Sequence, residues 1–365
     1  MLRFSGDVDV NSRPLLSSPG RRRWLRLSSL KSLRLKRRIK HRLGVLEPLR
    51  IQVYGGYAGR GSAIVWGRAL EDEPPLAPTP DDSVFDNLKR SWRQLESDEV
   101  PGLGLSVALD TSVVTVFTDQ EGYFATELSF ERPLSPGWWV ARASTFDTSL
   151  ALARGASGQG DVLVPSESAR FGIISDIDDT ILQSHVQNRM KQAYVSLLGN
   201  AVTRLSFEGT RDLLCGLERA GNQAPCFYVS RSAWNIHSTL EHFIVHQGLP
   251  KGPLVLRDVG LFNDREKRRG HKRREIERIF ATYPELAFVL LGDSGQQDAF
   301  IYLDVAHAHP GRVKAILIRD VSARRRSAEV RTALEQGCPP ACVAVLFEDA
   351  HAAARQCREH GLWYP

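Results

Sequence analysis

Three acids that could hold a metal ion follow a short apolar run in the middle of the chain. Residues 171–175 are mostly apolar, and Asp176 and Asp178 come next at positions i and i+2, with Asp179 directly after them. Residues two apart on an extended chain lie on the same side of the backbone. Two carboxylates so close repel each other unless a cation or a proton lies between them. The spacing indicates a site for a hard divalent cation, with Mg²⁺ as the natural occupant.

Other polar residues follow the later strands that the sequence predicts. Ser230 ends the apolar run 226–230, and Asp293 and Asp298 follow the run 288–292. Lys272 stands at the start of a predicted helix. Together these residues supply carboxylates for a metal, one hydroxyl and one ammonium, which is the set of groups that phosphoryl transfer needs.

The second half of the chain must position these residues. Beyond residue 165 it alternates between predicted strands and helices, which indicates a mostly parallel sheet covered on both faces. We expect strands at 171–175, 226–230, 254–257, 288–292, 313–318 and 343–347, and helices at 210–220, 235–247, 272–283, 297–306, 328–335 and 350–361. Ligands of such sheets bind beyond the carboxyl ends of the strands, where the polar residues lie.

The first half has a different pattern. Residues 49–54, 62–70, 105–109, 112–117, 122–128 and 138–143 are predicted strands with turn residues between them, and 85–95 a predicted helix. Regular short strands of this kind favour an antiparallel β-sandwich. We therefore expect a β-sandwich domain over 48–160, a linker at 155–160 and an α/β domain over 165–365.

Residues 1–47 precede both domains and are expected to be disordered, with a basic arm at 21–42. The arm contains 11 Lys or Arg and no acid. Subtracting these from the 48 basic residues leaves 37 against 42 acidic ones, so the rest of the chain has a balance of −5 within the net charge of +6. Apolar residues alternate with the basic ones, which suits an anionic membrane surface. A tail without a specific role and a nucleic-acid contact stay open as alternatives.

The composition also restricts the compartment. No apolar run is long enough to span a membrane and no signal peptide is evident, so a cytoplasmic protein is expected. The five cysteines are odd in number and lack the paired spacing of a zinc site, which favours reduced thiols.

The polar residues also resemble a known group of enzymes. Residues 176–180 resemble motif I of the haloacid-dehalogenase-type phosphohydrolases, Ser230 resembles motif II, Lys272 motif III, and Asp293 with Asp298 motif IV. Residues 228–235, 271–272, 291–298 and 318–321 resemble the catalytic domain of the actin-patch-associated phosphatidate phosphatases. Gly67, Arg68 and residues 118–124 resemble the β-sandwich that precedes this domain in bacterial members.

This resemblance implies a mechanism and a fold. Asp176 would be the nucleophile and form an aspartyl-phosphate, and Asp178 would be the general acid and base. Mg²⁺ would be bound by Asp176, Asp178, Asp293 and Asp298. Ser230 and Lys272 would hold the phosphoryl oxygens, and Thr180 would orient the loop. The fold implied is a Rossmann-like sheet of the haloacid dehalogenase type, with only a small flap over 183–208.

The substrate stays open at this point. A lipid phosphate such as phosphatidate is implied by the resemblance, and the weakly covered site agrees with it. Ala233, Ala299 and Phe300 depart from the family pattern, which bears on substrate selection more than on the reaction. The alternatives are a phosphatase for sugar phosphates, nucleotides or nucleic-acid ends, and a non-catalytic adaptor. The oligomeric state is not indicated by the sequence.

Overall fold

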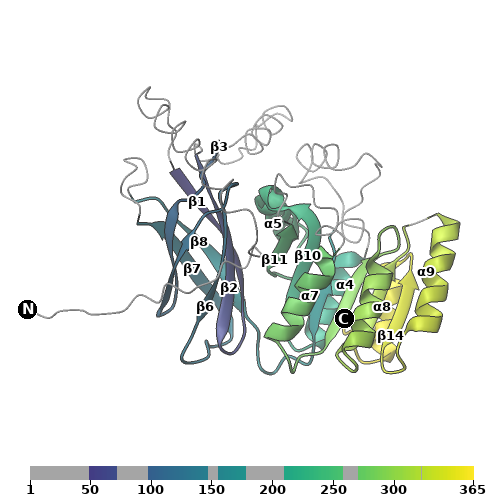
Figure 1. The fold of residues 1–365 in the computed structure, drawn as a ribbon. Coiled ribbons are helices and arrows are strands. Elements are labelled where there is room, and N and C mark those ends of the chain that lie inside the picture. Colours follow the sequence, from purple (N-terminus) through teal and green to yellow (C-terminus); the bar gives the residue numbers. More distant parts are fainter. Residues whose placement is uncertain (1–48, 72–97, 147–154, 178–208, 258–269, 322) are drawn as a thin grey trace, which may run out of the picture. The chain divides into compact units, whose positions relative to one another are not determined.

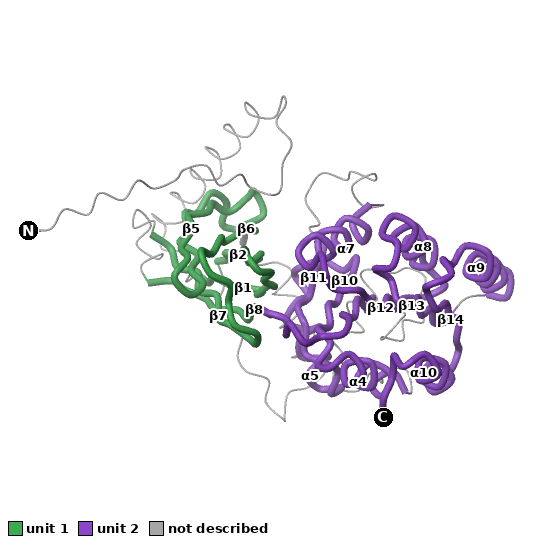
Figure 2. Tube along the Cα trace, turned by 90° about the horizontal axis from the view of Figure 1, so that it is seen from below, with its two compact units in different colours: residues 1–76, 96–162 green, residues 77–95, 163–365 purple. Residues whose placement is uncertain are grey.

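The computed structural model describes residues 49–71, 98–146, 155–177, 209–257, 270–321 and 323–365 (Figure 1). The chain divides into two compact units, one of residues 1–76 and 96–162 and one of residues 77–95 and 163–365 (Figure 2). Each unit is considered by itself. The basic arm, the predicted helix over 85–95 and the predicted flap over 183–208 lie outside the described residues.

Unit 1 is a β-sheet structure, in agreement with the period-two pattern of its sequence. Its strands are β1 (Leu49–Ala58), β2 (Ser62–Glu71), β3 (Asp98–Glu99), β4 (Gly104–Leu109), β5 (Ser112–Phe117), β6 (Tyr123–Ser129), β7 (Gly137–Thr145) and β8 (Ser157–Val164). They are connected in the order β3-β2-β1-β8-β7-β4-β5, and β6 pairs with β2 beside this path. The β1/β2, β2/β3, β2/β6, β4/β5 and β4/β7 pairs are antiparallel.

The core of unit 1 forms because alternate residues of a strand point to opposite faces. On β4, Leu105, Val107 and Leu109 are buried, while Ser106 and Ala108 are only partly covered. β6 buries Phe124 and Leu128. Burial thus alternates along β4, which lies at the predicted strand 105–109, whereas β3 and β8 were not among the predicted strands.

The linker expected at 155–160 is wrong, because residues 157–160 belong to β8, which lies between β1 and β7. Gly158 and Gly160 suggested a flexible connection. In the structure they allow a close approach of two backbones: a Cβ on Gly158 would lie 2.0 Å from the carbonyl oxygen of Ile51, and one on Gly160 would lie 2.6 Å from that of Val53. Glycine inside a strand is typical of such an approach.

Unit 2 contains a six-stranded sheet whose five pairs of neighbouring strands are all parallel. Its strands are β9 (Gly172–Ser175), β10 (Cys226–Ala233), β11 (Leu254–Arg257), β12 (Phe288–Asp293), β13 (Val313–Arg319) and β14 (Val343–Phe347). The order is β11-β10-β9-β12-β13-β14. Numbered within this unit, that is 3-2-1-4-5-6, the order of a doubly wound sheet. The predicted parallel sheet is thus confirmed.

Helices cover both faces of this sheet, and Figure 2 shows them as two layers with the strands between them. The helices are α4 (Thr210–Ala220), α5 (His237–His246), α7 (His271–Thr282), α8 (Asp298–Ala308), α9 (Arg324–Gly337) and α10 (Ala350–Glu359), with a 3₁₀ turn η2 at Trp234–Ile236. α7, α8 and α9 form one layer, and α4, α5 and α10 form the other. The apolar face of each helix packs on the sheet, as Leu213, Leu214 and Leu217 of α4 show by their burial.

The register of the central strands decides where the polar residues lie. Ser175 of β9 pairs with Tyr228 of β10 on one side and with Leu291 of β12 on the other. Asp176, Ser230 and Asp293 therefore leave the sheet at nearly the same level of its carboxyl edge. The chain reverses its strand order between β9 and β12, which is where doubly wound sheets bind their ligands.

Two smaller expectations can be compared with the structure. Among the described residues, none of the helices combines the length and the apolar character that a membrane span requires. The five cysteines, all of them described, are free thiols. Cys338 Sγ lies 3.2 Å from the carbonyl oxygen of Cys342 and forms no disulfide.

Candidate active site

Three carboxylates meet at the carboxyl edge of the parallel sheet. Asp176 follows β9, Asp293 ends β12, and Asp298 begins α8. One oxygen from each lies within 4.8 Å of the others, and all three residues are at most 1% exposed. Residues more than 110 positions apart in the sequence therefore form one buried acidic cluster. Like charges held this close in a low-dielectric site need a positive partner.

Lys272 supplies part of that positive charge. It is the second residue of α7 and is 2% exposed. Its Nζ lies 3.0 Å from Oδ1 of Asp176 and 2.5 Å from Oδ1 of Asp298. Burial by itself lowers the pKa of Lys272, but the carboxylates of Asp176 and Asp298 outweigh it and raise that pKa well above its usual value. Lys272 is therefore charged at neutral pH.

The charge balance of this cluster suits a divalent cation. Three ionised carboxylates and one ammonium leave a formal charge of −2. The donors of the cluster are all oxygens, the ligands that Mg²⁺ prefers. Of the four predicted metal ligands, the structure brings Asp176, Asp293 and Asp298 together, whereas Asp178 lies outside the described residues, as does Thr180.

A tight turn between β12 and α8 holds two of the acids in place. The backbone N–H of Gln296 donates to Oδ1 of Asp293 at 2.8 Å, and the N–H of Asp293 donates to Oδ2 of Asp298 at 3.3 Å. Backbone amides that bind a carboxylate fix its orientation and favour its ionised form.

Gly292 makes this turn possible, and sequence reasoning gave it no role. A Cβ on Gly292 would lie 2.6 Å from Oδ2 of Asp298 and 2.9 Å from the Tyr302 ring. The Tyr302 hydroxyl donates to the carbonyl oxygen of Leu291 at 3.1 Å, which holds the ring over this strand end. Only a glycine fits between the strand and the first turn of α8. The signal was its place directly before Asp293.

We expect Gly292→Ala to displace Asp298 and so to weaken Mg²⁺ binding. The added methyl group cannot fit at 2.6 Å, so the carboxylate or the start of α8 must move. The Mg²⁺ concentration that gives half-maximal stabilisation against heat should rise by about tenfold or more, in line with the loss of roughly one good ligand contact. Gly61→Ala is a matched control, because a Cβ there meets no atom within 4 Å. An unchanged Mg²⁺ response of Gly292→Ala would contradict the role given to this glycine.

Ser230 lies at the same edge, at the point where β10 leaves the parallel register. Its Oγ accepts a hydrogen bond from the backbone N–H of Ser232 at 2.9 Å, and the residue is fully buried. This contact uses an acceptor position of the hydroxyl and not its hydrogen.

Two histidines of unit 2, His237 and His271, are buried. His271 begins α7 and its ring contacts the backbone of Ser230, which links α7 to the end of β10. Burial, with Arg274 and Arg257 nearby, lowers the pKa of His271 to about 3, so the ring is neutral at pH 7. The sequence gave no sign that His271 is buried, because the helix that it begins, α7, is of mixed polarity.

Two arginine side chains bind the turn between β12 and α8. Arg326 of α9 donates to the carbonyl oxygen of Gln296 at 2.7 Å and to that of Ser294 at 3.2 Å. Arg231 donates to the side-chain oxygen of Gln296. Arg231 and Gln296, which were considered for a headgroup contact, therefore bind each other.

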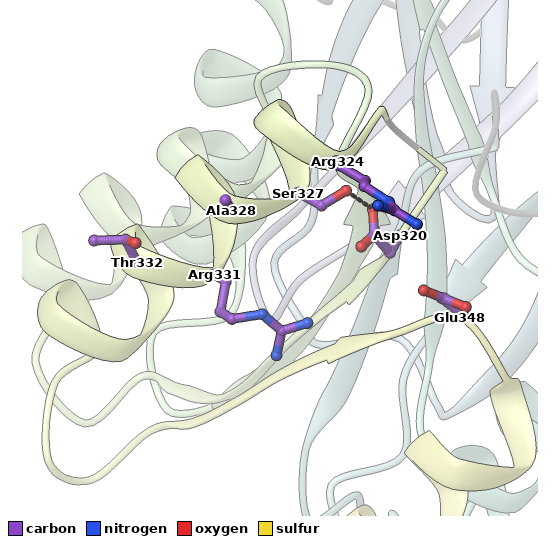
Figure 3. A pocket seen from close by; sticks show the side chains of 7 residues that line it. All are labelled: Asp320, Arg324, Ser327, Ala328, Arg331, Thr332 and Glu348. Carbon is purple, nitrogen blue, oxygen red and sulfur yellow. Dashed lines mark hydrogen bonds between the residues drawn. The ribbon is translucent and has the colours of Figure 1, made fainter.

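A pocket of about 540 Å³ lies beside the same turn (Figure 3). Asp320 is one of its lining residues and accepts hydrogen bonds from Ser294 at 2.9 Å and from Ser327 at 2.7 Å. The remaining lining residues are Arg324, Ser327, Ala328, Arg331, Thr332 and Glu348. None of the predicted site residues lines it, and its two arginines are matched by two acids. Through Ser294, Asp320 contacts the turn.

Comparisons with known proteins match the part of the chain that carries the acidic cluster. Residues 171–320 match the family model described as the catalytic domain of phosphatidate phosphatase APP1. An uncharacterized protein of Schizosaccharomyces pombe is 30% identical over 154 residues, which are 41% of this chain and 25% of that protein. Phosphatidate phosphatase APP1 of Saccharomyces cerevisiae is 29% identical over 152 residues, 41% of this chain and 26% of that protein.

The residues matched by the family model lie in unit 2. The chain spans about a quarter of the length of these two relatives. Among solved structures, one in the Pnkp1/Rnl/Hen1 RNA repair complex is 15% identical, with a TM-score of 0.26 over 50% of this chain and 45% of that one. A TM-score this low carries no argument about fold or function.

Proposed function

We propose, from the match of residues 171–320 to the family model of the phosphatidate phosphatase APP1 catalytic domain, that this chain is a phosphomonoesterase dependent on Mg²⁺. One observation carries the proposal. Asp176 is buried at the carboxyl end of the first strand of the parallel sheet, paired with Lys272, and next to Asp293 and Asp298. These groups would serve as a nucleophile, a cation for the phosphoryl oxygens and ligands for a metal.

The reaction would have two steps. In the first, a carboxylate oxygen of Asp176 attacks the phosphorus, the bond to the leaving oxygen breaks, and that oxygen takes a proton from Asp178. In the second, water attacks the aspartyl-phosphate, gives a proton to Asp178, and regenerates the Asp176 carboxylate with release of phosphate. Splitting one displacement into two lowers each barrier. The role of Asp178 follows from the family pattern, since this residue lies outside the described ones.

The other residues of the site would bind and neutralise. Lys272 would hold a phosphoryl oxygen and limit the negative charge at Asp176, from which its Nζ is 3.0 Å. The hydroxyl of Ser230 would donate to a second phosphoryl oxygen, and Thr180 would orient the loop after Asp178. Mg²⁺, bound by Asp176, Asp178, Asp293 and Asp298, would neutralise charge that develops on the transferred group. The haloacid-dehalogenase type of Rossmann-like fold is proposed on the same grounds, supported by the strand order of unit 2.

The substrate we propose is phosphatidate or another lipid phosphate. The family match supports a lipid substrate. The basic arm over 21–42 would help to hold the chain at the cytoplasmic face of an anionic membrane, because about 1 kcal/mol is gained for each basic residue near such a surface.

A panel of phosphomonoesters tests this proposal. Purified full-length chain is given phosphatidate in mixed micelles, sugar phosphates, nucleotides, a nucleic-acid 5′-phosphate and an aryl phosphate, with Mg²⁺ or with a chelator. We expect release of phosphate with Mg²⁺ only, and a kcat/KM for phosphatidate at least about tenfold above that of each soluble natural ester. A preference for a soluble ester would overturn the lipid substrate alone. No release from any ester would overturn the enzyme and favour a binding protein.

A further inference from the structure

Strands β4, β5 and β7 of unit 1 share a face that carries several exposed apolar side chains beside the polar Thr115 and Ser144. In the antiparallel register Ala108 pairs with Val113 on one side and with Arg142 on the other, and Gly104 pairs with Phe117. Because alternate residues share a face, the exposed side chains here include Val113, Phe117, Trp138, Val140, Arg142 and Phe146. We call this surface the β4-β5-β7 face.

Most of the exposed large apolar side chains in the described part of the chain lie on the β4-β5-β7 face. Of the eight large apolar side chains that are exposed in the described part of the chain, five lie on it. Phe117 is 64% exposed, Val113 62% and Phe146 48%. The other three lie apart from one another along the chain of unit 2: Val245 on α5, Val321 after β13 and Tyr364 after α10. Single exposed apolar residues are ordinary, but a group on one flat sheet face marks a surface for a partner or a membrane.

Phe117 and Phe146 pack against each other on this face. Their ring centroids are 6.2 Å apart, with the planes nearly perpendicular at 83°. Both rings lie over Gly104: a Cβ there would meet Phe146 at 2.5 Å and Phe117 at 3.2 Å. The absence of a side chain on β4 therefore lets two aromatic rings from neighbouring strands come together at the surface.

The charges on the face limit what can cover it. Arg142 is exposed on β7, and no outward position of β4, β5 or β7 carries an acid. A second copy of the chain, docked by the same face, would bury each Arg142 with no carboxylate from that face to pair with, which is costly. A lipid bilayer supplies phosphate groups for the arginine and an apolar boundary region for the rings. Aromatic side chains are enriched at that boundary.

We propose that the β4-β5-β7 face docks on the surface of a bilayer that contains anionic lipid. Phe117, Phe146, Trp138 and Val140 enter the boundary between headgroups and acyl chains, and Arg142 contacts lipid phosphates. The choice of a bilayer also rests in part on the proposed lipid substrate. This contact is separate from the basic arm, and it gives unit 1 a function that catalysis does not require.

Co-sedimentation of the full-length chain with vesicles tests the docking. The vesicles are phosphatidylcholine alone or phosphatidylcholine mixed with phosphatidylserine, at low and at high salt, because salt screens the basic arm more than it affects apolar insertion. The double variant Phe117→Ser, Phe146→Ser should bind about tenfold more weakly than wild type at high salt, as expected for losing the burial of two partly inserted rings. Val245→Ser is the matched control, since Val245 is 70% exposed on α5 and outside the face.

A charge variant gives an independent measurement. Arg142→Glu should weaken binding to the vesicles with phosphatidylserine and have little effect on those without it, whereas Arg132→Glu, on an exposed loop of unit 1, should have a smaller effect. Double-variant binding equal to wild type at both salt concentrations would overturn the proposal. So would a wild-type dimer, measured by light scattering, that Phe117→Ser, Phe146→Ser converts to monomer.

The docking and the enzyme can fail separately. Release of phosphate from a soluble aryl ester should be the same in the double variant as in wild type, because neither phenylalanine lies in unit 2. A chain that binds vesicles through this face and hydrolyses no ester would contradict the proposed function only. A chain that hydrolyses phosphatidate with unchanged vesicle binding in both variants would contradict the docking only.

Discussion

Replacing Asp176 with Asn is expected to abolish the Mg²⁺-dependent release of phosphate from an aryl ester. The carboxamide keeps the shape of the side chain but cannot attack phosphorus as a carboxylate does, and it weakens a metal ligand. Removal of a nucleophile that works as a unit with its neighbours lowers kcat by on the order of 10⁴-fold or more. The measurement is initial-rate phosphate release with saturating Mg²⁺.

The variant should still fold, which separates catalysis from stability. Asp176 is crowded by Asp293 and Asp298, so losing one negative charge should leave the Tm in the absence of Mg²⁺ unchanged or higher. Asp212→Asn on the exposed side of α4 is a matched control and should retain full activity. Residual activity of Asp176→Asn within about tenfold of wild type would show that another residue is the nucleophile.

Replacing Lys272 with Met should both destabilise the fold and reduce activity. The ammonium pairs with Asp176 and Asp298 and is itself buried, so its loss leaves three buried carboxylates without a fixed cation. Breaking a buried charge pair from one side costs about 3 to 5 kcal/mol. The free energy of unfolding, measured with urea in a chelator, should fall by that order. Activity should fall by about a hundredfold or more, because a charged contact to the transferring group is lost.

Added Mg²⁺ should return part of the lost stability to Lys272→Met, because the metal replaces the missing positive charge. Arg273→Met is the control: the next residue of α7, its side chain is 45% exposed and its contacts to Glu277 and Asp304 are both 3.4 Å. Exposed pairs of this kind contribute at most about 1 kcal/mol. Equal losses of stability in the two variants would mean that the carboxylates are not ionised together as the geometry indicates.

Elements of unit 2 were predictable because their sequence signals are local. A strand such as 254–257 or 343–347 is a short apolar run between turn residues, and both were predicted with the bounds observed. Helix α4 has apolar residues on one face, and a helix with this pattern buries that face. The parallel arrangement followed from the alternation of strands and helices, since crossovers of that length allow little else.

Other features depended on contacts between distant segments. Residues 157–160 looked like a linker because Gly158 and Gly160 are small, whereas their closeness to Ile51 and Val53 arises only when β8 lies against β1. The burial of His271 likewise depends on its contact with the end of β10. Neither contact has a counterpart in the neighbouring sequence.

By itself the sequence predicted candidate residues for the chemistry, because acids that follow apolar strands stand out wherever they are placed. It also determined the order and type of the elements of unit 2 along the chain, because periodicity is a property of neighbouring residues. Only the tertiary structure decided that Asp176, Lys272, Asp293 and Asp298 share one buried cluster and that Gly292 leaves room for it. It also decided that Phe117 and Phe146 meet over Gly104. Strand register and helix packing set those distances, and both arise from contacts between residues far apart in the chain.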